Sequence, residues 1–158
     1  ASPNIDKRKG YYSYLSNIFT KYHGLINGPG WPFCRYVMEK VFHNDFYAKS
    51  KVGINLHHPM SINDPCELNE RTYTLASAGI PQLVDNAKLI TTHFPDKTLF
   101  IADKPSEYLE LFEFIFKNEK LSNQYALKAR KVVLEKHTIF HRMNCFLSSL
   151  IKLGILKS

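Results

Sequence analysis

Short apolar runs alternate with helical patterns along the middle of the chain. The run Val52-Gly53-Ile54-Asn55-Leu56 is typical of a strand buried in a parallel sheet. A helical pattern begins near Asn69 or Glu70 and ends at Gly79, after which Ile80–Asp85 supplies the next extended segment. A crossover of this length makes the two strands parallel and places the helix on one face of the sheet. The pattern therefore predicts a strand, a loop, a helix and a second strand.

Further elements are expected on both sides of this unit. An apolar stripe within Lys7–Lys21 predicts a helix, and His23–Asn27 is a short strand candidate. After Asp85 we expect a short helix over Ala87–Thr92 and a strand over Thr98–Ala102. Three helices follow, from Pro105 to Asn118, over Leu121–Lys136 and over Ile139–Leu153, with core positions at Tyr108, Leu109, Leu111, Phe112, Ile115, Phe116, Phe140, Met143, Phe146, Leu147, Leu150 and Ile151. The fold class is α/β, a Rossmann-like three-layer α/β/α domain with a mostly parallel sheet, ending in carboxyl-terminal helices.

Candidate chemistry gathers at the start of the central helix. Ligands of open α/β sheets bind at the carboxyl ends of strands, and a helix amino terminus offers unpaired N–H groups and a partial positive charge. Asn69, Glu70, Arg71 and Thr72 therefore lie where a phosphate would bind. The arginine fork suits a diphosphate, although a salt bridge from Arg71 to Glu67 or Glu70 would explain the same pattern.

Two adjacent histidines, His57 and His58, follow the first strand of this unit. Neighbouring residues at a strand end point to opposite sides, and no Cys or carboxylate lies at a ligand spacing, so a metal site is not expected. The remaining interpretations are a histidine that lines a ligand site or forms a hydrogen bond there, and a structural histidine.

Longer motifs connect the chain with a known family. The successions KVGINLHHP, NERTYTLASAGIPQLVD and FPDKTLFIADKPSEYLELFEFIFKNEKLSNQYALKARKVVLEKHTIFHR, with SPNIDKR and GPGW before them, extend over nearly the whole chain. Together they resemble the carboxyl-terminal half of CgeB-like glycosyltransferases, which belong to the glycosyl transferases of group 1 and have the two-domain GT-B fold.

The resemblance implies a domain that binds a nucleotide-sugar, part of an enzyme that transfers a sugar to an unknown acceptor. It implies no cofactor and no required metal, and an amino-terminal Rossmann-like domain that this chain lacks. The isolated domain would then be inactive or weakly active. Lys7, Arg8 and His58 would join Asn69, Glu70, Arg71 and Thr72 around the donor phosphates, although Lys7 and Arg8 could equally be exposed surface cations.

One residue departs from the family pattern. Thr74 stands where the family usually has Glu, an acid expected to contact the donor ribose. The alternative hypothesis is therefore a non-catalytic, glycosyltransferase-like interaction or regulatory module. Catalytic residues cannot be assigned, because the acceptor site and any general base are expected on the missing half.

Composition narrows these possibilities only in part. The 158 residues are enough for one domain, spanning 1–158, and 44% hydrophobic with 22% charged residues is ordinary for a globular protein. A net charge of +7 attracts nucleic acid, anionic lipid or an anionic small molecule, but no nucleic-acid module is recognisable. The three cysteines are widely spaced, which predicts free thiols. The sequence has a polar start and no apolar run long enough for a transmembrane segment, so we expect a cytoplasmic protein.

Overall fold

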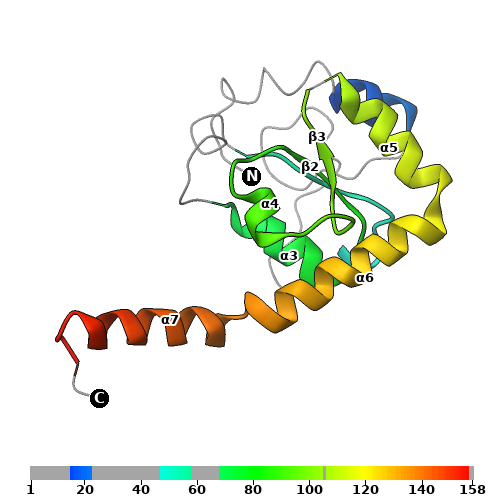
Figure 1. Ribbon diagram of the computed structural model, residues 1–158. Helices are drawn as coiled ribbons and strands as arrows, with labels where there is room; N and C mark the ends of the chain where they lie inside the picture. Colours follow the sequence, from blue (N-terminus) through cyan, green and yellow to red (C-terminus); the bar gives the residue numbers. More distant parts are fainter. Residues whose placement is uncertain (1–14, 23–46, 58–67, 105, 157–158) are drawn as a thin grey trace.

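The computed structural model describes residues 15–22, 47–57, 68–104 and 106–156. Its centre is a parallel sheet in the order β1-β2-β3, formed by β1 (Gly53–Asn55), β2 (Gln82–Asp85) and β3 (Phe100–Ala102) (Figure 1). Ile54 pairs with Leu83, and Leu83 pairs with Phe100. The predicted parallel α/β architecture is confirmed.

Two helices connect the strands. α3 (Glu70–Ala78) joins β1 to β2, and α4 (Ile90–His93) joins β2 to β3. Because sequential parallel strands with right-handed crossovers place their helices on one face, both helices cover the same side of the sheet. The helix expected over Ala87–Thr92 is present, but it begins three residues later.

Apolar side chains of β2 alternate between the two faces of the sheet. Leu83 belongs to a core cluster with Leu15, Ile18 and α5 (Glu107–Lys117). Val84, the next residue, packs with α3, α4 and α6 (Glu119–Lys136) on the opposite face. Helices therefore cover both faces, and the layers are α/β/α.

Close packing of α3 on the sheet depends on Gly53. A Cβ at this position would lie 3.0 Å from side-chain carbons of Ile80 and of Leu75. The absence of a side chain lets the helix approach β1, a recognised reason for glycine inside a strand.

The carboxyl-terminal helix α7 (Ile139–Lys152) corrects a sequence-based expectation. None of its residues is buried, and its apolar side chains are exposed: Ile139, Phe140, Met143, Phe146, Leu147 and Ile151. Figure 1 shows α7 projecting from the body beyond the end of α6. The helical pattern was correct, but its apolar stripe does not pack on this domain, because periodicity identifies an apolar face and not what covers it.

Phe116 in α5 is a second correction. It was expected in the core, yet it is 43% exposed, with the Lys51 ammonium 5.3 Å from its ring centroid. Tyr108, Phe112 and Ile115 are buried as predicted. The strand candidate His23–Asn27 and the first part of the Lys7–Lys21 helix lie outside the described residues, and residues 15–21 of that helix are helical.

Both ends of α3 lie where the sequence predicts them, with the start near Asn69 and the end at Gly79. Asn69 is the N-cap, and Gly79 is the C-cap with φ of 71°, in the left-handed region that favours glycine.

We predict that Gly79→Ala lowers the free energy of unfolding by about 1 kcal/mol, because alanine is strained at this positive φ. Gly79→Asn is the control, since asparagine tolerates the left-handed conformation and should lose less. Denaturant unfolding of both variants measures the difference. Equal losses would assign the effect to the nearby Arg130 side chain, whose Cδ is 3.4 Å from where a Cβ at position 79 would lie, and not to the backbone.

Candidate functional site

The amino terminus of α3 is tied to the carboxyl end of β1. Asn69 Nδ2 donates to Asn55 Oδ1 at 3.0 Å and to the Leu56 carbonyl at 3.2 Å. Asn69 Oδ1 accepts from the Thr72 backbone N–H at 3.0 Å and from the Thr72 hydroxyl at 2.9 Å. One asparagine therefore caps the helix and fixes where it starts relative to the strand.

Behind this cap lies a buried polar cluster. The Asn55 amide nitrogen lies 2.9 Å from Thr72 Oγ1, 3.1 Å from Asn69 Oδ1 and 3.1 Å from Gln82 Oε1. Gln82 Nε2 donates in turn to the Thr72 carbonyl at 3.2 Å. Asn55, Thr72 and Gln82 are almost fully buried, so these bonds replace water that the groups lose on folding. The cluster joins β1, α3 and β2 through side chains as well as through the sheet.

His57 completes the connection to β2. Its backbone N–H donates to Asp85 Oδ2 at 2.8 Å, and its Nδ1 lies 2.6 Å from Asp85 Oδ1. His57 Nε2 lies 3.4 Å from Thr72 Oγ1. The carboxylate therefore holds both the backbone and the ring of the residue that leads out of β1.

The order Thr72, His57, Asp85 has the appearance of a nucleophile, base and acid. Thr72 and His57 are buried, and the Thr72 hydroxyl donates its proton to Asn69. A nucleophile must reach substrate and share its proton with the base, so this arrangement fits a structural brace and not a catalytic triad.

The other residues predicted at this site have different environments. Glu70 and Arg71 are exposed on the first turn of α3, and no described carboxylate forms an ion pair with Arg71. The Thr72 side chain points into the polar cluster, and its backbone N–H is bonded to the N-cap Asn69. His58, Lys7 and Arg8 lie outside the described residues, as does Glu67, the second partner considered for Arg71.

Polar residues also follow β2 and β3 at the same edge of the sheet. Asn86 Nδ2 donates to Asp103 Oδ1 at 2.6 Å, and both residues are exposed. Glu107 Oε2 accepts from the backbone N–H groups of Asp103 at 2.8 Å and Lys104 at 3.2 Å. The carboxyl edge of the sheet thus has buried hydrogen-bonded side chains that connect the strands to α3, and exposed polar residues outside them.

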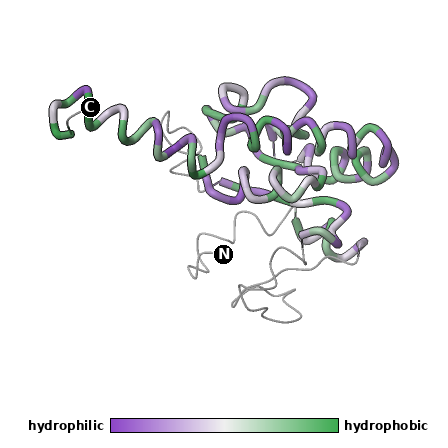
Figure 2. Tube along the Cα trace, turned by 90° about the horizontal axis from the view of Figure 1, so that it is seen from below, coloured by the Kyte–Doolittle hydropathy of each residue, from purple (hydrophilic) through white to green (hydrophobic). Residues whose placement is uncertain are grey.

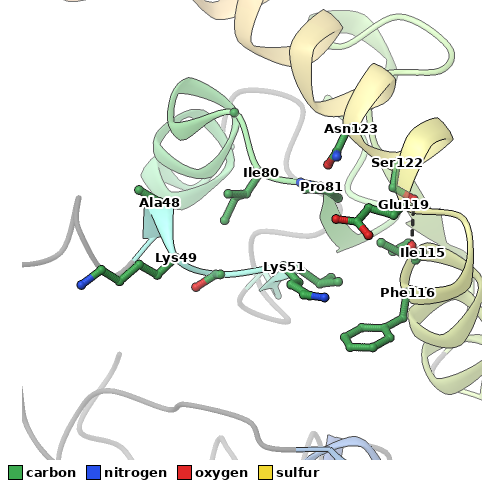
Figure 3. Close-up of a pocket in the computed structure, with 13 residues that line it drawn as sticks. Ala48, Lys49, Lys51, Ile80, Pro81, Ile115, Phe116, Glu119, Ser122 and Asn123 are labelled. Carbon is green, nitrogen blue, oxygen red and sulfur yellow. Dashed lines mark hydrogen bonds between the residues drawn. The ribbon is translucent and has the colours of Figure 1, made fainter.

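A pocket of about 260 Å³ lies at the opposite edge of the sheet. Figure 3 shows Lys49 and Lys51 before β1, Ile80 and Pro81 before β2, and Glu119 across from them. These segments precede the strands, so the pocket is at their amino ends. It does not coincide with the carboxyl edge where open α/β sheets bind ligands, and we do not assign the donor to it.

An aromatic cluster surrounds the junction of α6 and α7. The His93 and His137 rings stack with centroids 4.9 Å apart, and the Tyr73 hydroxyl lies 2.5 Å from His93 Nδ1. The Arg142 guanidinium lies 4.7 Å from the Tyr73 ring centroid. Burial, and then the positive charge of Arg142, lowers the pKa of His93. Burial, and then the charge of His93, lowers the pKa of His137.

Among the described residues, no three His, Cys, Asp or Glu side chains are placed to hold a metal ion. Within the same ranges, every helix is too short or too polar to cross a membrane.

Sequence reasoning missed Asn55 and Gln82. Asn55 was included in an apolar strand and Gln82 in an extended segment, yet both side chains are buried partners in the cluster. A polar amide inside an otherwise apolar strand was the available signal, because buried amides need hydrogen-bond partners.

These features define the structural class of the protein as a Rossmann-like α/β domain with a parallel sheet and a capped helix at the carboxyl edge. A comparison with family models then gives a match to the family described as glycosyl transferase-like, over residues 13–148. The match covers most of the chain, which therefore belongs to this glycosyl transferase-like family. Comparisons with curated proteins and with solved structures gave no match.

We predict that Asp85→Asn lowers the free energy of unfolding by about 2 kcal/mol, since the amide cannot accept from both His57 donors as a carboxylate does. Asp103→Asn makes the same change at an exposed partner of Asn86 and should cost less than about 0.5 kcal/mol. Denaturant titration of both variants checks this. Equal stabilities would show that the His57–Asp85 contact does not brace the fold.

The histidine pair predicts a pH effect on stability. Because both pKa values lie below the ordinary 6.5, the unfolded chain binds protons more readily than the folded one as the pH falls. The contribution of this pair to the free energy of unfolding should thus be fully present above about pH 7 and decrease below pH 6.5 until the folded-state pKa values are passed.

The double variant His93→Asn with His137→Asn removes both titrating rings, and an asparagine oxygen at position 93 can still accept from the Tyr73 hydroxyl. Its unfolding free energy should change less between pH 8 and pH 5 than that of the unchanged chain. An unchanged slope would assign the pH dependence to other groups.

Proposed function

We propose that this chain is the donor domain of a glycosyltransferase and binds a nucleotide-sugar at the first turn of α3. The observation that carries the proposal is the exposed Arg71 beside a helix amino terminus at the carboxyl edge of a parallel sheet, in a chain of the glycosyl transferase-like family. The CgeB-like resemblance of the sequence supports the same assignment.

The proposed mechanism is electrostatic. The N–H groups of Glu70 and Arg71 have no intrahelical acceptor by helix geometry, whereas that of Thr72 is bonded to Asn69. These two N–H groups and the Arg71 guanidinium would hold the donor diphosphate and stabilise the charge on the leaving group as the glycosidic bond breaks. The chemistry requires no metal at this site. An acceptor site and any general base would lie on another domain.

The buried cluster has an indirect role in this proposal. Asn69 holds the first turn of α3 against β1, and His57–Asp85 holds the chain that leaves β1. Hydrogen-bond donors that are already oriented need not reorganise when a phosphate binds, which is the main advantage of a preorganised site. His58 follows this brace directly in the sequence and is proposed to line the donor, with Lys7 and Arg8 as further phosphate ligands.

A second candidate function is a non-catalytic interaction or regulatory module. Thr74 favours it, because the threonine replaces the acid that the family is expected to use for the donor ribose. Its hydroxyl donates to the Glu70 carbonyl at 3.1 Å, so this side chain is bonded to its own helix. Nucleotide titration separates the two functions, and an oligonucleotide titrated at several salt concentrations tests for non-specific nucleic-acid binding.

We predict that a nucleoside diphosphate shifts the amide NMR signals of Asn69 to Thr72 in the isolated chain. Arg71→Ala should weaken this binding by about ten-fold or more, because it removes a charge-assisted hydrogen-bond donor. Arg130→Ala is the matched control, since Arg130 is an exposed arginine that lies beside Gly79 at the other end of α3.

Loss of affinity in Arg71→Ala alone supports the donor site. The absence of signal changes at millimolar nucleotide, or equal losses in the two variants, would favour the non-catalytic module.

A further inference from the structure

A short junction joins α7 to the body of the domain. His137 is the C-cap of α6, with φ of −130° and ψ of 20°, and Thr138 is the N-cap of α7. No residue of α7 is buried, and Figure 1 and Figure 2 both show the helix extending away from the body. The orientation of α7 therefore depends on the side chains that meet at this junction.

Aromatic rings from α3 and α4 pack against the His137 ring. It stacks on His93, with centroids 4.9 Å apart and planes inclined by 14°, and on Phe94, with centroids 6.0 Å apart. The Tyr73 ring centroid lies 5.3 Å from that of His137, and the Tyr73 hydroxyl oxygen lies 2.5 Å from His93 Nδ1. His137 thus ties the last turn of α6, where α7 departs, to α3 and α4.

The charges next to this stack of rings are positive. The Arg142 guanidinium of α7 lies 4.7 Å from the Tyr73 ring centroid, and Lys136 directly precedes His137 in α6. Among the described residues, no Asp or Glu side chain forms an ion pair with His93, His137 or Arg142. A proton added to either imidazole therefore meets two cations and no carboxylate that would offset them.

Protonation changes the contacts of both imidazoles. Neutral His93 can accept from the Tyr73 hydroxyl at Nδ1, whereas an imidazolium can only donate. Two stacked imidazoliums also repel each other, and partial burial removes water that would screen them. Burial and then Arg142 lower the pKa of His93, and burial and then His93 lower the pKa of His137. The packed junction thus favours neutral rings, and protonated rings favour an open junction.

We propose that the His93–His137 stack is a pH-sensitive joint that holds α7 in one orientation while both imidazoles are neutral and releases the helix when they are protonated. On release the His137 ring leaves His93, while α6 stays on the body through buried residues such as Ala129 and Val133. Because both pKa values are lowered from 6.5 in the closed joint, the joint is closed above that pH and opens as the pH falls below it. The joint does not depend on the donor site or on what covers the apolar face of α7.

The experiment measures ¹⁵N relaxation of the whole chain at about pH 8 and at about pH 5.5. At the higher pH, amides of α6 and α7 should both have order parameters of about 0.85, the value of a rigid backbone. At the lower pH, those of α7 should fall below about 0.6 while those of α6 stay unchanged. The imidazole signals of His93 and His137 should titrate over the same pH range, and circular dichroism should show that the helices are retained.

A matched pair of variants identifies the group responsible. His137→Phe keeps a ring that can stack on His93 but cannot take up a proton, so α7 should remain ordered at the lower pH. His141→Phe is the control, because His141 lies in the first turn of α7 with its Nδ1 2.6 Å from Thr138 Oγ1 and is not part of the stack. This control should respond to pH as the unchanged chain does.

Three results would overturn the proposal. Amides of α7 could be mobile already at the higher pH, or equally ordered at both pH values. The pH response could persist in His137→Phe or vanish in His141→Phe, which would assign it to another group. Amides of α6 could lose order together with those of α7, which would show that protonation acts on the stability of the whole domain and not on the joint.

Discussion

The structure depends on hydrogen bonds that join the carboxyl ends of two strands to the start of one helix. Asn69 caps α3 and bonds to β1, while Asp85 of β2 holds His57, two residues beyond the end of β1. His57 and Asp85 are buried and lose water on folding, so leaving either without its partner costs more than the bond itself contributes. These hydrogen bonds therefore fix one arrangement of β1, α3 and β2. The first turn of α3, where a ligand is proposed to bind, is held in place by the buried side chains beneath it.

Much of the architecture could be predicted from the sequence because its signals are local. Asn69 and Gly79 define α3 by side-chain capping and a left-handed backbone, and the apolar runs identify three strands in sequential order. Parallel pairing followed from the crossover length. The errors are in burial. Phe116 and the stripe of α7 have helical periodicity like that of Phe112, but only tertiary contacts decide which stripes are covered.

The sequence predicted where Asn69 to Thr72 lie in the fold, but not the surroundings of each side chain. The sequence indicated the first turn of α3, where the structure places Arg71 in solvent. It did not indicate that Thr72 faces inward, because a threonine after an N-cap can point either way until the neighbours are known. The amide of Asn55 inside an apolar run indicated a need for buried hydrogen-bond partners, but those partners lie 14 to 27 residues away in the sequence, so the pattern could not identify them. Polar networks of this kind form between elements, and local patterns do not record them.

The burial of α6 and α7 differs in a way that bears on how the chain can change in evolution. α6 contributes Ser122, Ala126, Ala129 and Val133 to the interior, whereas α7 contributes nothing. Substitutions of the exposed apolar residues of α7 should therefore change the stability of this domain little, so selection for a stable domain would act only weakly on its phenylalanines and leucines. If those residues persist among relatives, the pressure that retains them comes from outside the folded body.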